Sequence, residues 1–419
     1  MKNVYLFFAA GRYWPDAEKL QAVYRELADR IAQDGTSVLY VDELQGEFPE
    51  GDCAILVPLS GAVQRLILQA SGTYECCILY GAYVRGNASE ESLNAMLYAN
   101  AAPTLMDSWA VTHRTRKTAL LALNEEELAY KKEILAAYHY VRGARILKIG
   151  ETEPWVISNA ACAEAYCERF GVEIVPVRQQ EVVEIYEGTS EQDGALYRDY
   201  FVSNSQGCKE PDERDICNAS RMAAALTALM DRYEADGAAI ACFDLLRTGT
   251  NMCLGVSYIN DCTDRFISCE CDMDSAVTML MMKQLTKGRL WMANPGLHPD
   301  GTVNFSHCTG PIHVMGNACP CVLRSHHESG IGVSLQIDYP IGARVTACRV
   351  SDNASKITIQ MGTSVEGAYE PCCRTQMHVR FDDFEHYLDT ALGCHQVFAF
   401  EDIGKKMRSL ADLLDLTIV

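Results

Sequence analysis

A regular alternation of short apolar runs and amphipathic stretches limits the fold of this chain more than any other feature of its sequence. In the first 114 residues each apolar run has the length of a buried strand, and helical spacing follows it, as in residues 16–33, where apolar residues from Leu20 to Ile31 recur on one face. Alternation of this kind predicts a doubly wound parallel sheet. The expected strands are residues 2–10, 36–41, 53–59, 76–80 and 104–106, and the expected helices are residues 16–33, 62–71 and 89–100.

The same alternation resumes after a long charged stretch and predicts a second parallel domain. Residues 115–141 are rich in charges and are expected to form one helix that leads away from the first domain. A less regular, charged stretch is expected at residues 179–212. Strands of the second domain are expected at residues 145–149, 173–176 and 238–243, with helices at residues 160–170 and 216–235.

The last part of the chain has a different pattern, in which short runs of alternating apolar and polar residues are separated by turn residues. Such runs predict an antiparallel sheet or a small barrel. They lie at residues 332–338, 344–350, 356–362 and 375–380, and closing helices are expected at residues 384–392 and 402–414. We therefore expect an α/β protein in which two doubly wound domains, residues 1–114 and 115–305, precede a β-rich, barrel-like domain at residues 306–419.

The charge and the cysteines of the chain restrict its partners and its location. The formal net charge is −20, whereas nucleic acids and anionic membranes are bound by clustered Lys and Arg, so neither partner is expected. No apolar run reaches the ~18 residues of a membrane span, and the apolar N-terminal run fits a first buried strand better than a signal peptide. The 19 cysteines are scattered and odd in number, which is typical of reduced thiols in the cytoplasm.

A run of alternating carboxylates is the strongest candidate for a functional site. Glu270, Asp272 and Asp274 occupy every second position, and alternate residues of an extended segment share one face. A helical run follows, and the chain then has the pattern of a second parallel strand that ends at Asn294. In a strand–helix–strand unit, ligands bind at the carboxyl ends of the strands. The pattern predicts a cation between Glu270 and Asn294, to which His307 could add an imidazole.

Several of these residues also have a purely structural interpretation. For Asp274 a helix-capping role is favoured over catalysis. His307 fits a metal or substrate contact and a packed histidine equally well. Cys308 and Cys394 flank candidate histidines, and we expect buried unreactive thiols there rather than a nucleophile.

Other residues are candidates for substrate contacts. Arg12 and Trp14 follow the first strand and could reach the site of a neighbouring subunit to stack on a sugar, although such a segment is also often only a loop. His326 and His327 precede a glycine-rich turn, where pocket lining is slightly favoured over a surface position. Arg374 either organises the β-rich domain or touches substrate.

Three short runs together give the chain a resemblance to a known family. Glu270-Cys271-Asp272 ends an expected strand, Ala293-Asn294 ends the next one, and Gly393-Cys394-His395-Gln396 precedes the last helix. In these runs the chain resembles the L-fucose isomerases and their shorter fucose-isomerase-like relatives. In that family the first run is Glu-x-Asp, the second ends in an aspartate ligand, and the third supplies a histidine ligand.

The resemblance is specific over about residues 240–419 and rests on architecture alone before them. Runs at residues 306–309, 326–330 and 373–376 are also similar to the shorter relatives. The resemblance implies two flavodoxin-like domains before the β-rich one, and a homo-oligomer, a trimer or hexamer, with sites formed between subunits. It also implies an aldose–ketose isomerase that acts on a free sugar or sugar derivative through an enediol and uses a divalent cation, usually manganese.

The resemblance further implies the roles of individual residues. Glu270, Asn294 and His395 would hold Mn²⁺, with Mg²⁺ as a second choice, and Glu270 with Asp272 would carry protons. Asn294 stands where the family has an aspartate, and an amide oxygen can bind a hard cation but cannot carry a proton. Two alternatives follow: a sugar-binding or regulatory relative without isomerase activity, and a metal-dependent epimerase or lyase on the same scaffold. The sequence has no phosphate-binding cluster, which favours an unphosphorylated sugar.

Overall fold

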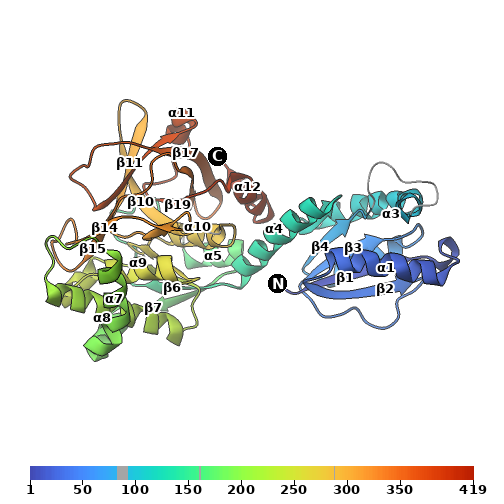
Figure 1. The fold of residues 1–419 in the computed structure, drawn as a ribbon, viewed down its shortest axis with the longest axis horizontal. Coiled ribbons are helices and arrows are strands. Elements are labelled where there is room, and N and C mark those ends of the chain that lie inside the picture. Colours follow the sequence, from blue (N-terminus) through green and yellow to red (C-terminus); the bar gives the residue numbers. More distant parts are fainter. Residues whose placement is uncertain (83–92, 160–161, 287) are drawn as a thin grey trace. The chain divides into compact units, whose positions relative to one another are not determined.

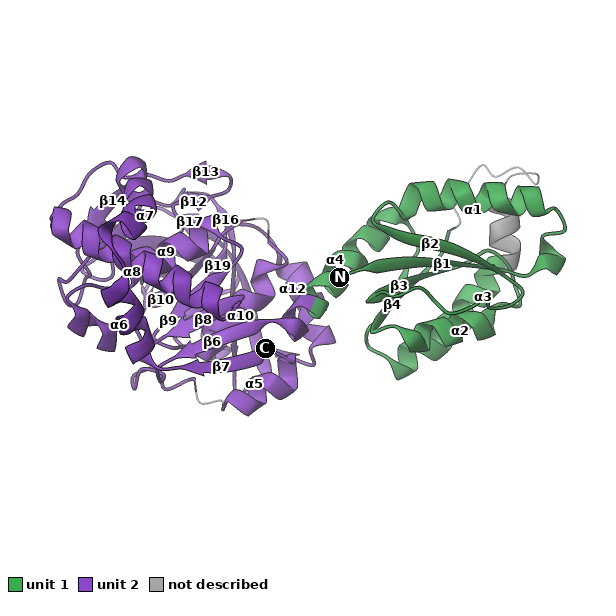
Figure 2. Ribbon diagram, turned by 90° about the horizontal axis from the view of Figure 1, so that it is seen from below, with its two compact units in different colours: residues 1–139 green, residues 140–419 purple. Residues whose placement is uncertain are grey.

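The structure, a computed structural model, describes residues 1–82, 93–159, 162–286 and 288–419, with the side chains of residues 93–100 left out of the description. The chain forms two compact units, Met1–His139 and Tyr140–Val419 (Figures 1 and 2). Among the helices of these ranges, none combines the length and the apolar character needed to cross a membrane. None of the 19 cysteines, all of which lie in the described ranges, forms a disulfide.

The first unit is a five-stranded parallel sheet with α1 on one face and α2 and α3 on the other (Figure 2). Its strand order, β2-β1-β3-β4-β5, is one of the common orders of doubly wound sheets. Every residue of β1 is buried, as expected for a strand covered on both faces. The strands are β1 (Asn3–Ala9), β2 (Gly35–Val41), β3 (Cys53–Pro58), β4 (Cys76–Tyr80) and β5 (Ala119–Ala122), and the helices are η1 (Gly11–Tyr13), α1 (Ala17–Ile31), α2 (Gln64–Thr73), α3 (Leu93–Thr115) and α4 (Glu125–Gly143), which continues past the end of the unit.

Two predictions for this unit are wrong. Residues 104–106, predicted as a strand, lie inside α3, where Thr104 and Leu105 are buried and Met106 is exposed; so short a run does not distinguish a strand from part of a helix. The helix predicted at residues 115–141 is interrupted by β5, which pairs with β4 although its sequence, Ala-Leu-Leu-Ala, favours a helix. β5 extends the first sheet beyond residue 114, the predicted domain boundary. The helix predicted at residues 89–100 begins outside the described residues, and its described part is the start of α3.

The second unit contains a four-stranded parallel sheet of order β7-β6-β8-β9. Residues 179–212, predicted to be irregular, contain two helices, α6 and α7. Ser190 and Asp212 form capping boxes at the starts of α7 and α8, a local signal that favours helices there. The strands are β6 (Arg145–Ile149), β7 (Glu173–Val177), β8 (Gly237–Ile240) and β9 (Phe266–Cys269), and the helices are α5 (Ala163–Phe170), α6 (Gln179–Gly188), α7 (Glu191–Asn204), α8 (Glu213–Arg232), η2 (Asp244–Thr248), α9 (Cys253–Cys262) and α10 (Met273–Lys283).

The prediction of an antiparallel barrel in the last part of the chain is confirmed. Strands pair antiparallel in the closed order β16-β19-β10-β11-β18-β17 and back to β16, so none of these strands leaves a free edge. The barrel strands are β10 (Leu290–Leu297), β11 (Thr302–His307), β16 (Arg344–Ser351), β17 (Lys356–Val365), β18 (Thr375–Phe381) and β19 (Gln396–Ala399). The remaining elements are β12 (His313–Val314), β13 (Asn317–Ala318), β14 (Cys321–Arg324), β15 (Ser334–Ile337), α11 (Phe384–Asp389), α12 (Gly404–Leu413) and β20 (Thr417–Ile418).

The strand–helix–strand unit predicted around the carboxylates is wrong in its second strand. β10 does not join the parallel sheet; it pairs antiparallel with β11 and β19 in the barrel. The connecting helix α10 contacts β8 and β9 on the sheet and β16 and β19 on the barrel. A helix covered on all sides should be apolar all round, and every α10 residue from Met273 to Met282 is buried. The carboxylates that precede α10 therefore lie where the sheet and the barrel meet.

Candidate metal centre

A strained turn carries the first candidate residue from the parallel sheet into α10. Glu270 and Cys271 both have positive φ, 60° and 48°, a conformation that residues other than glycine seldom adopt. The turn is held by hydrogen bonds from the backbone N–H of Cys271 to the Ile240 carbonyl (2.9 Å) and from the N–H of Glu153 to the Glu270 carbonyl (3.1 Å). Strain held in place by surrounding bonds is common at functional sites. The predicted extended run, with its carboxylates on one face, is therefore wrong.

The Glu270 carboxylate is buried and held at both of its oxygens. The indole Nε1 of Trp155 donates to Oε2 at 2.6 Å, and Oε1 lies 3.4 Å from Nε2 of His395. Burial alone would raise the pKa of Glu270, but the neighbouring His395 outweighs burial and lowers this pKa. Glu270 is therefore an ionised carboxylate at neutral pH.

His395, directly before β19, has one ring nitrogen anchored and the other without a hydrogen bond. Nδ1 lies 2.8 Å from Oδ2 of Asp272, while Nε2 is buried, has no hydrogen-bond partner and faces Glu270. Burial would lower the pKa of His395, but Asp272 and Glu270 raise it to about 10. The proton on Nε2, which faces Glu270, occupies the place that a cation would take. A carboxylate on the second ring nitrogen is the usual arrangement of metal-binding histidines.

Asp272 is fully buried and serves as the anchor of this arrangement. It accepts from the backbone N–H and the hydroxyl of Ser275 at 3.1 and 2.9 Å, which caps α10, and from Arg349 at 2.9 Å. Burial would raise the pKa of Asp272, but the Arg349 guanidinium and His395 lower it strongly. The capping role predicted for Asp274 therefore belongs to Asp272. Every oxygen of Asp272 faces protein groups, and this residue does not line the pocket described below.

Asp274 lies in the first turn of α10 and has structural partners. It accepts hydrogen bonds from the hydroxyls of Tyr166 (2.7 Å) and Ser351 (2.8 Å) and lies 3.7 Å from Arg349. Burial and the negative charge of Asp272 raise the pKa of Asp274 to about 6. Arg349 thus sits between two buried carboxylates, with its side chain fully buried.

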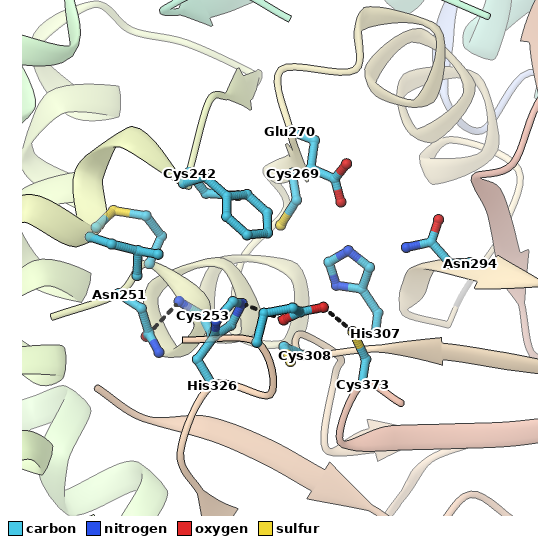
Figure 3. A pocket seen from close by; sticks show the side chains of 14 residues that line it. Cys242, Asn251, Cys253, Cys269, Glu270, Asn294, His307, Cys308, His326 and Cys373 are labelled. Carbon is cyan, nitrogen blue, oxygen red and sulfur yellow. Dashed lines mark hydrogen bonds and ion pairs between the residues drawn. The ribbon is translucent and has the colours of Figure 1, made fainter. Parts of the chain in front are cut away.

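A pocket opens beside Glu270, and Asn294 and His307 face into it (Figure 3). Asn294 lies in β10 opposite Ser306 of β11, so His307 is its near neighbour across the barrel wall. Burial lowers the pKa of His307 to about 4, and its Nδ1 lies 2.8 Å from the Thr309 hydroxyl. His307 is therefore a neutral imidazole. The lining residues are Cys242, Phe243, Leu246, Asn251, Met252, Cys253, Cys269, Glu270, Asn294, His307, Cys308, His326, Glu328 and Cys373.

Two residues of the pocket lining, Glu270 and His307, form with the neighbouring His395 a group that fits a divalent cation. The ligand atoms of Glu270, His307 and His395 all lie within 4.8 Å of one another, and all three residues are buried. Nε2 of His395 has no hydrogen-bond partner and lies 3.4 Å from Oε1 of Glu270, so a cation between these two atoms would replace its proton. One carboxylate and two imidazoles, with the Asn294 amide oxygen nearby, form a donor set suited to Mn²⁺ or Mg²⁺ more than a thiolate set would be.

Sulfur atoms form another part of the pocket wall. The Cys373 thiol donates to Glu328 Oε1 at 3.4 Å, and the neighbouring Cys308 together with burial raises the pKa of Cys373. Glu328 Oε2 lies 3.2 Å from Nε2 of His326. Cys308 is buried, as expected from the sequence, whereas Cys394 is exposed, so the prediction of a buried thiol is wrong for Cys394.

The predicted substrate residues have different environments in the structure. Of the two candidate histidines, His326 lines the pocket, and His327 is not among its lining residues. Arg374 bonds to the carbonyl and hydroxyl of Ser325 at 2.9 and 3.2 Å, which fits the organising role. Trp14 is buried in the first unit, where its indole donates to the Leu59 carbonyl at 2.9 Å, so it offers no stacking surface. Arg12 is exposed, 4.9 Å from the ring centre of Tyr13.

Two residues of the centre, Arg349 and Trp155, are absent from the predicted set. Arg349 had a usable signal, because an arginine inside the short apolar run of β16 requires a buried carboxylate as partner. Trp155 lies in an irregular segment after β6, and nothing in the local sequence connects it with Glu270.

Comparison of the sequence with protein-family models and with curated proteins finds no match. The resemblance to the fucose isomerases therefore stays a prediction.

Proposed function

We propose that this protein is a metal-dependent aldose–ketose isomerase that acts on a free sugar or sugar derivative. The observation that carries the proposal is the environment of His395. Its Nδ1 is held by a buried carboxylate, and its Nε2 has no hydrogen bond and faces Glu270 at the inner end of a pocket. That arrangement supports a metal ligand, and the resemblance to the fucose isomerases supplies the reaction.

Glu270 and His395 would hold the cation, with Asn294 and His307 as the further ligands from the barrel. Mn²⁺ is the proposed ion, because it accepts the oxygens of Glu270 and Asn294 as well as imidazole nitrogens, and Mg²⁺ is the second choice. When bound, the cation would polarise the carbonyl of the sugar and orient the adjacent hydroxyl. Asp272 would act as a positioning residue that keeps Nε2 of His395 turned toward the site.

The reaction requires one proton to move from C2 to C1 and another from O2 to O1. Glu270 is the proposed proton carrier between the carbons, because it is ionised, faces the pocket and is oriented by Trp155. Asp272, the second expected proton carrier, is bonded on all sides and takes the positioning role instead. Among the described residues that line the pocket, none is Lys or Arg, which favours an unphosphorylated sugar.

The remaining parts of the proposal come from the resemblance. It implies two flavodoxin-like domains before the barrel, and the strand orders of the two parallel sheets support that description. It also implies a trimer or hexamer with sites between subunits. The unpaired cysteines support a reducing compartment such as the cytoplasm.

Asn294 favours a second candidate function, a sugar-binding or regulatory protein without isomerase activity. Its amide lines the pocket where the family has an acidic ligand, and an amide cannot carry a proton. An epimerase or lyase on the same scaffold would need the same cation and proton carrier.

Solvent-deuterium exchange tests the proposal. Purified protein with Mn²⁺ is incubated in deuterated buffer with a panel of pentoses, deoxyhexoses and acidic sugars, and deuterium at C1 and C2 is measured. We expect incorporation into at least one sugar and its loss in Glu270→Gln. Glu184→Gln, an exposed glutamate on α6, is the matched control and should keep full exchange.

Tight Mn²⁺ binding without exchange into any sugar would exclude isomerisation and favour the binding protein. Exchange that survives in Glu270→Gln would show that another group carries the proton. Exchange at a carbon other than C1 or C2 would instead indicate an epimerase or lyase.

A further inference from the structure

A second group of metal-binding side chains lies on the barrel and shares no residue with the centre described above. His298 directly follows β10, His378 lies in β18, and Glu370 lies in the segment between β17 and β18. The ligand atoms of these three residues lie within 4.8 Å of one another, and Nε2 of His298 is 2.8 Å from Oε1 of Glu370. The two imidazole rings are 5.4 Å apart between their centres.

Each imidazole of this group is anchored through one nitrogen, and the second nitrogen of His298 lies 2.8 Å from Glu370, where an ion would replace the proton between them. Nε2 of His378 lies 2.9 Å from the carbonyl of Ala368, which accepts its proton and leaves Nδ1 as the donor atom. Nδ1 of His298 lies 3.2 Å from the hydroxyl of Thr302, which leaves Nε2 facing Glu370. Metal-binding histidines are usually oriented in this way, by a backbone carbonyl or polar group on the second nitrogen.

The backbone of Glu370 is also held in place. The amide of Gln376 bonds to Glu370 on both sides: Oε1 accepts from the backbone N–H at 2.9 Å, and Nε2 donates to the carbonyl at 2.8 Å. Thr302, which anchors His298, donates in turn to Asp300 at 2.6 Å. A simple surface ion pair needs neither a second histidine nor this set of outer bonds.

We propose that His298, Glu370 and His378 form a binding site for a divalent transition-metal ion, for which Zn²⁺ is the natural probe. Two imidazoles and one carboxylate are a common zinc ligand set, and they leave a coordination position for water. The side chains of His298 and Glu370 are 29% and 32% exposed, so an ion can reach them from solvent. The imidazole nitrogens favour a transition metal over Ca²⁺ or Mg²⁺.

A bound ion here would connect the barrel with the pocket wall. It would tie the segment that carries Glu370 to β10 and β18, and Cys373 of the same segment lines the pocket beside Glu270. The expected role is to fix the position of that wall. The site does not depend on the proposed isomerase activity, and its test measures bound metal.

The experiment compares the zinc content of chelator-treated protein after dialysis against Zn²⁺, for the parent and a His298→Gln/His378→Gln variant. The readout is the difference in zinc content between the two proteins, so that zinc taken up by other groups cancels. We expect the variant to bind one equivalent less per chain, and Zn²⁺ to raise the Tm of the parent more than that of the variant. His386→Gln, on the exposed surface of α11, is the matched control and should bind as many equivalents as the parent.

A variant with a smaller change tests the same site if the double variant does not fold. Thr302→Val retains all three ligands and removes only the hydroxyl that anchors His298. We expect it to bind that equivalent of Zn²⁺ roughly 10- to 100-fold more weakly, the usual effect of losing an outer partner. An unchanged zinc content in a folded double variant, judged by circular dichroism, overturns the site.

Discussion

The carboxyl ends of the two parallel sheets carry very different side chains, although each sheet has a fully buried inner strand, β1 in the first unit and β8 in the second. After β1 of the first unit, the chain passes through η1 to Trp14, whose indole is buried and bonded to a backbone carbonyl. After β9 of the second unit, the chain passes through Glu270 and Asp272, two buried carboxylates bonded to a buried arginine and histidine.

The difference comes from what packs beyond the carboxyl end of each sheet. In the second unit the barrel supplies Arg349 from β16, His395 before β19 and the pair Asn294 and His307 from β10 and β11. In the first unit the described elements around the sheet are helices and loops. The carboxyl end of a parallel sheet does not form a charged centre by itself. In the second unit the centre forms because polar side chains of the barrel pack against that end of the sheet.

The largest expected effect comes from breaking the buried ion pair of the second unit. Arg349→Met leaves Asp272 buried and without its countercharge, which should cost about 3–5 kcal/mol of the free energy of unfolding. Lys132→Met in the first unit breaks the more exposed pair with Asp34 and should cost about 1 kcal/mol or less. Urea unfolding followed by circular dichroism, with the transition of each unit fitted separately, measures both changes. Equal losses of unfolding free energy in the two variants would contradict the expected difference between the two sheet ends.

The next effect concerns the metal rather than stability. His395→Asn removes the anchored ligand and should weaken Mn²⁺ binding by at least about 100-fold, because the loss of a ligand exceeds the loss of an outer partner. His139→Asn is the control in the first unit: its imidazole also lies 2.8 Å from a carboxylate oxygen, but both side chains are about one third exposed. Titration of each protein with Mn²⁺, followed by the spin-resonance signal of the free ion, gives the affinities. Parent-like affinity in His395→Asn would exclude this residue as a ligand.

Mn²⁺ affinity should also rise with pH. Without metal, His395 holds a proton with a pKa of about 10, and a cation must displace that proton to reach Nε2. Below this pKa a lower proton concentration favours the metal, so affinity should increase by up to about tenfold per pH unit between pH 6 and pH 8. Glu270, with its lowered pKa, and His307, with a pKa of about 4, do not titrate in this window and add nothing to the slope. A flat profile would show that no proton leaves on binding.

Much of the fold could be predicted because local patterns determine it. Buried apolar strands followed by amphipathic helices identified the parallel sheets, and short alternating runs identified the barrel. The errors arose where pairing depends on distant partners. β5 joins the first sheet against its own helix propensity because β4 offers an open edge, and β10 leaves the parallel register because β19, far along the chain, pairs with it.

The candidate centre could be predicted only as a set of residues, not as an arrangement. Glu270 and His395 were named from short motifs, and the structure brings them together. The sequence could not divide the roles among the three carboxylates, because their environments depend on Arg349 and Tyr166, which lie elsewhere in the chain. Asp272 therefore became the helix cap and histidine anchor, and Asp274 became a buried partner of two hydroxyls.

The smallest effect is expected in the first unit, at the residues predicted to reach a neighbouring subunit's sugar. Arg12 is exposed and Trp14 is buried, so only Arg12 is free to contact a ligand. If sites form between subunits, Arg12→Ala should raise KM for the sugar by roughly two- to tenfold, the effect of one lost hydrogen bond, without changing Mn²⁺ affinity. Trp14→Phe should leave KM unchanged. A KM that neither substitution changes would mean that the first unit contributes nothing to sugar binding, and that the second unit carries the whole substrate site as well as the metal.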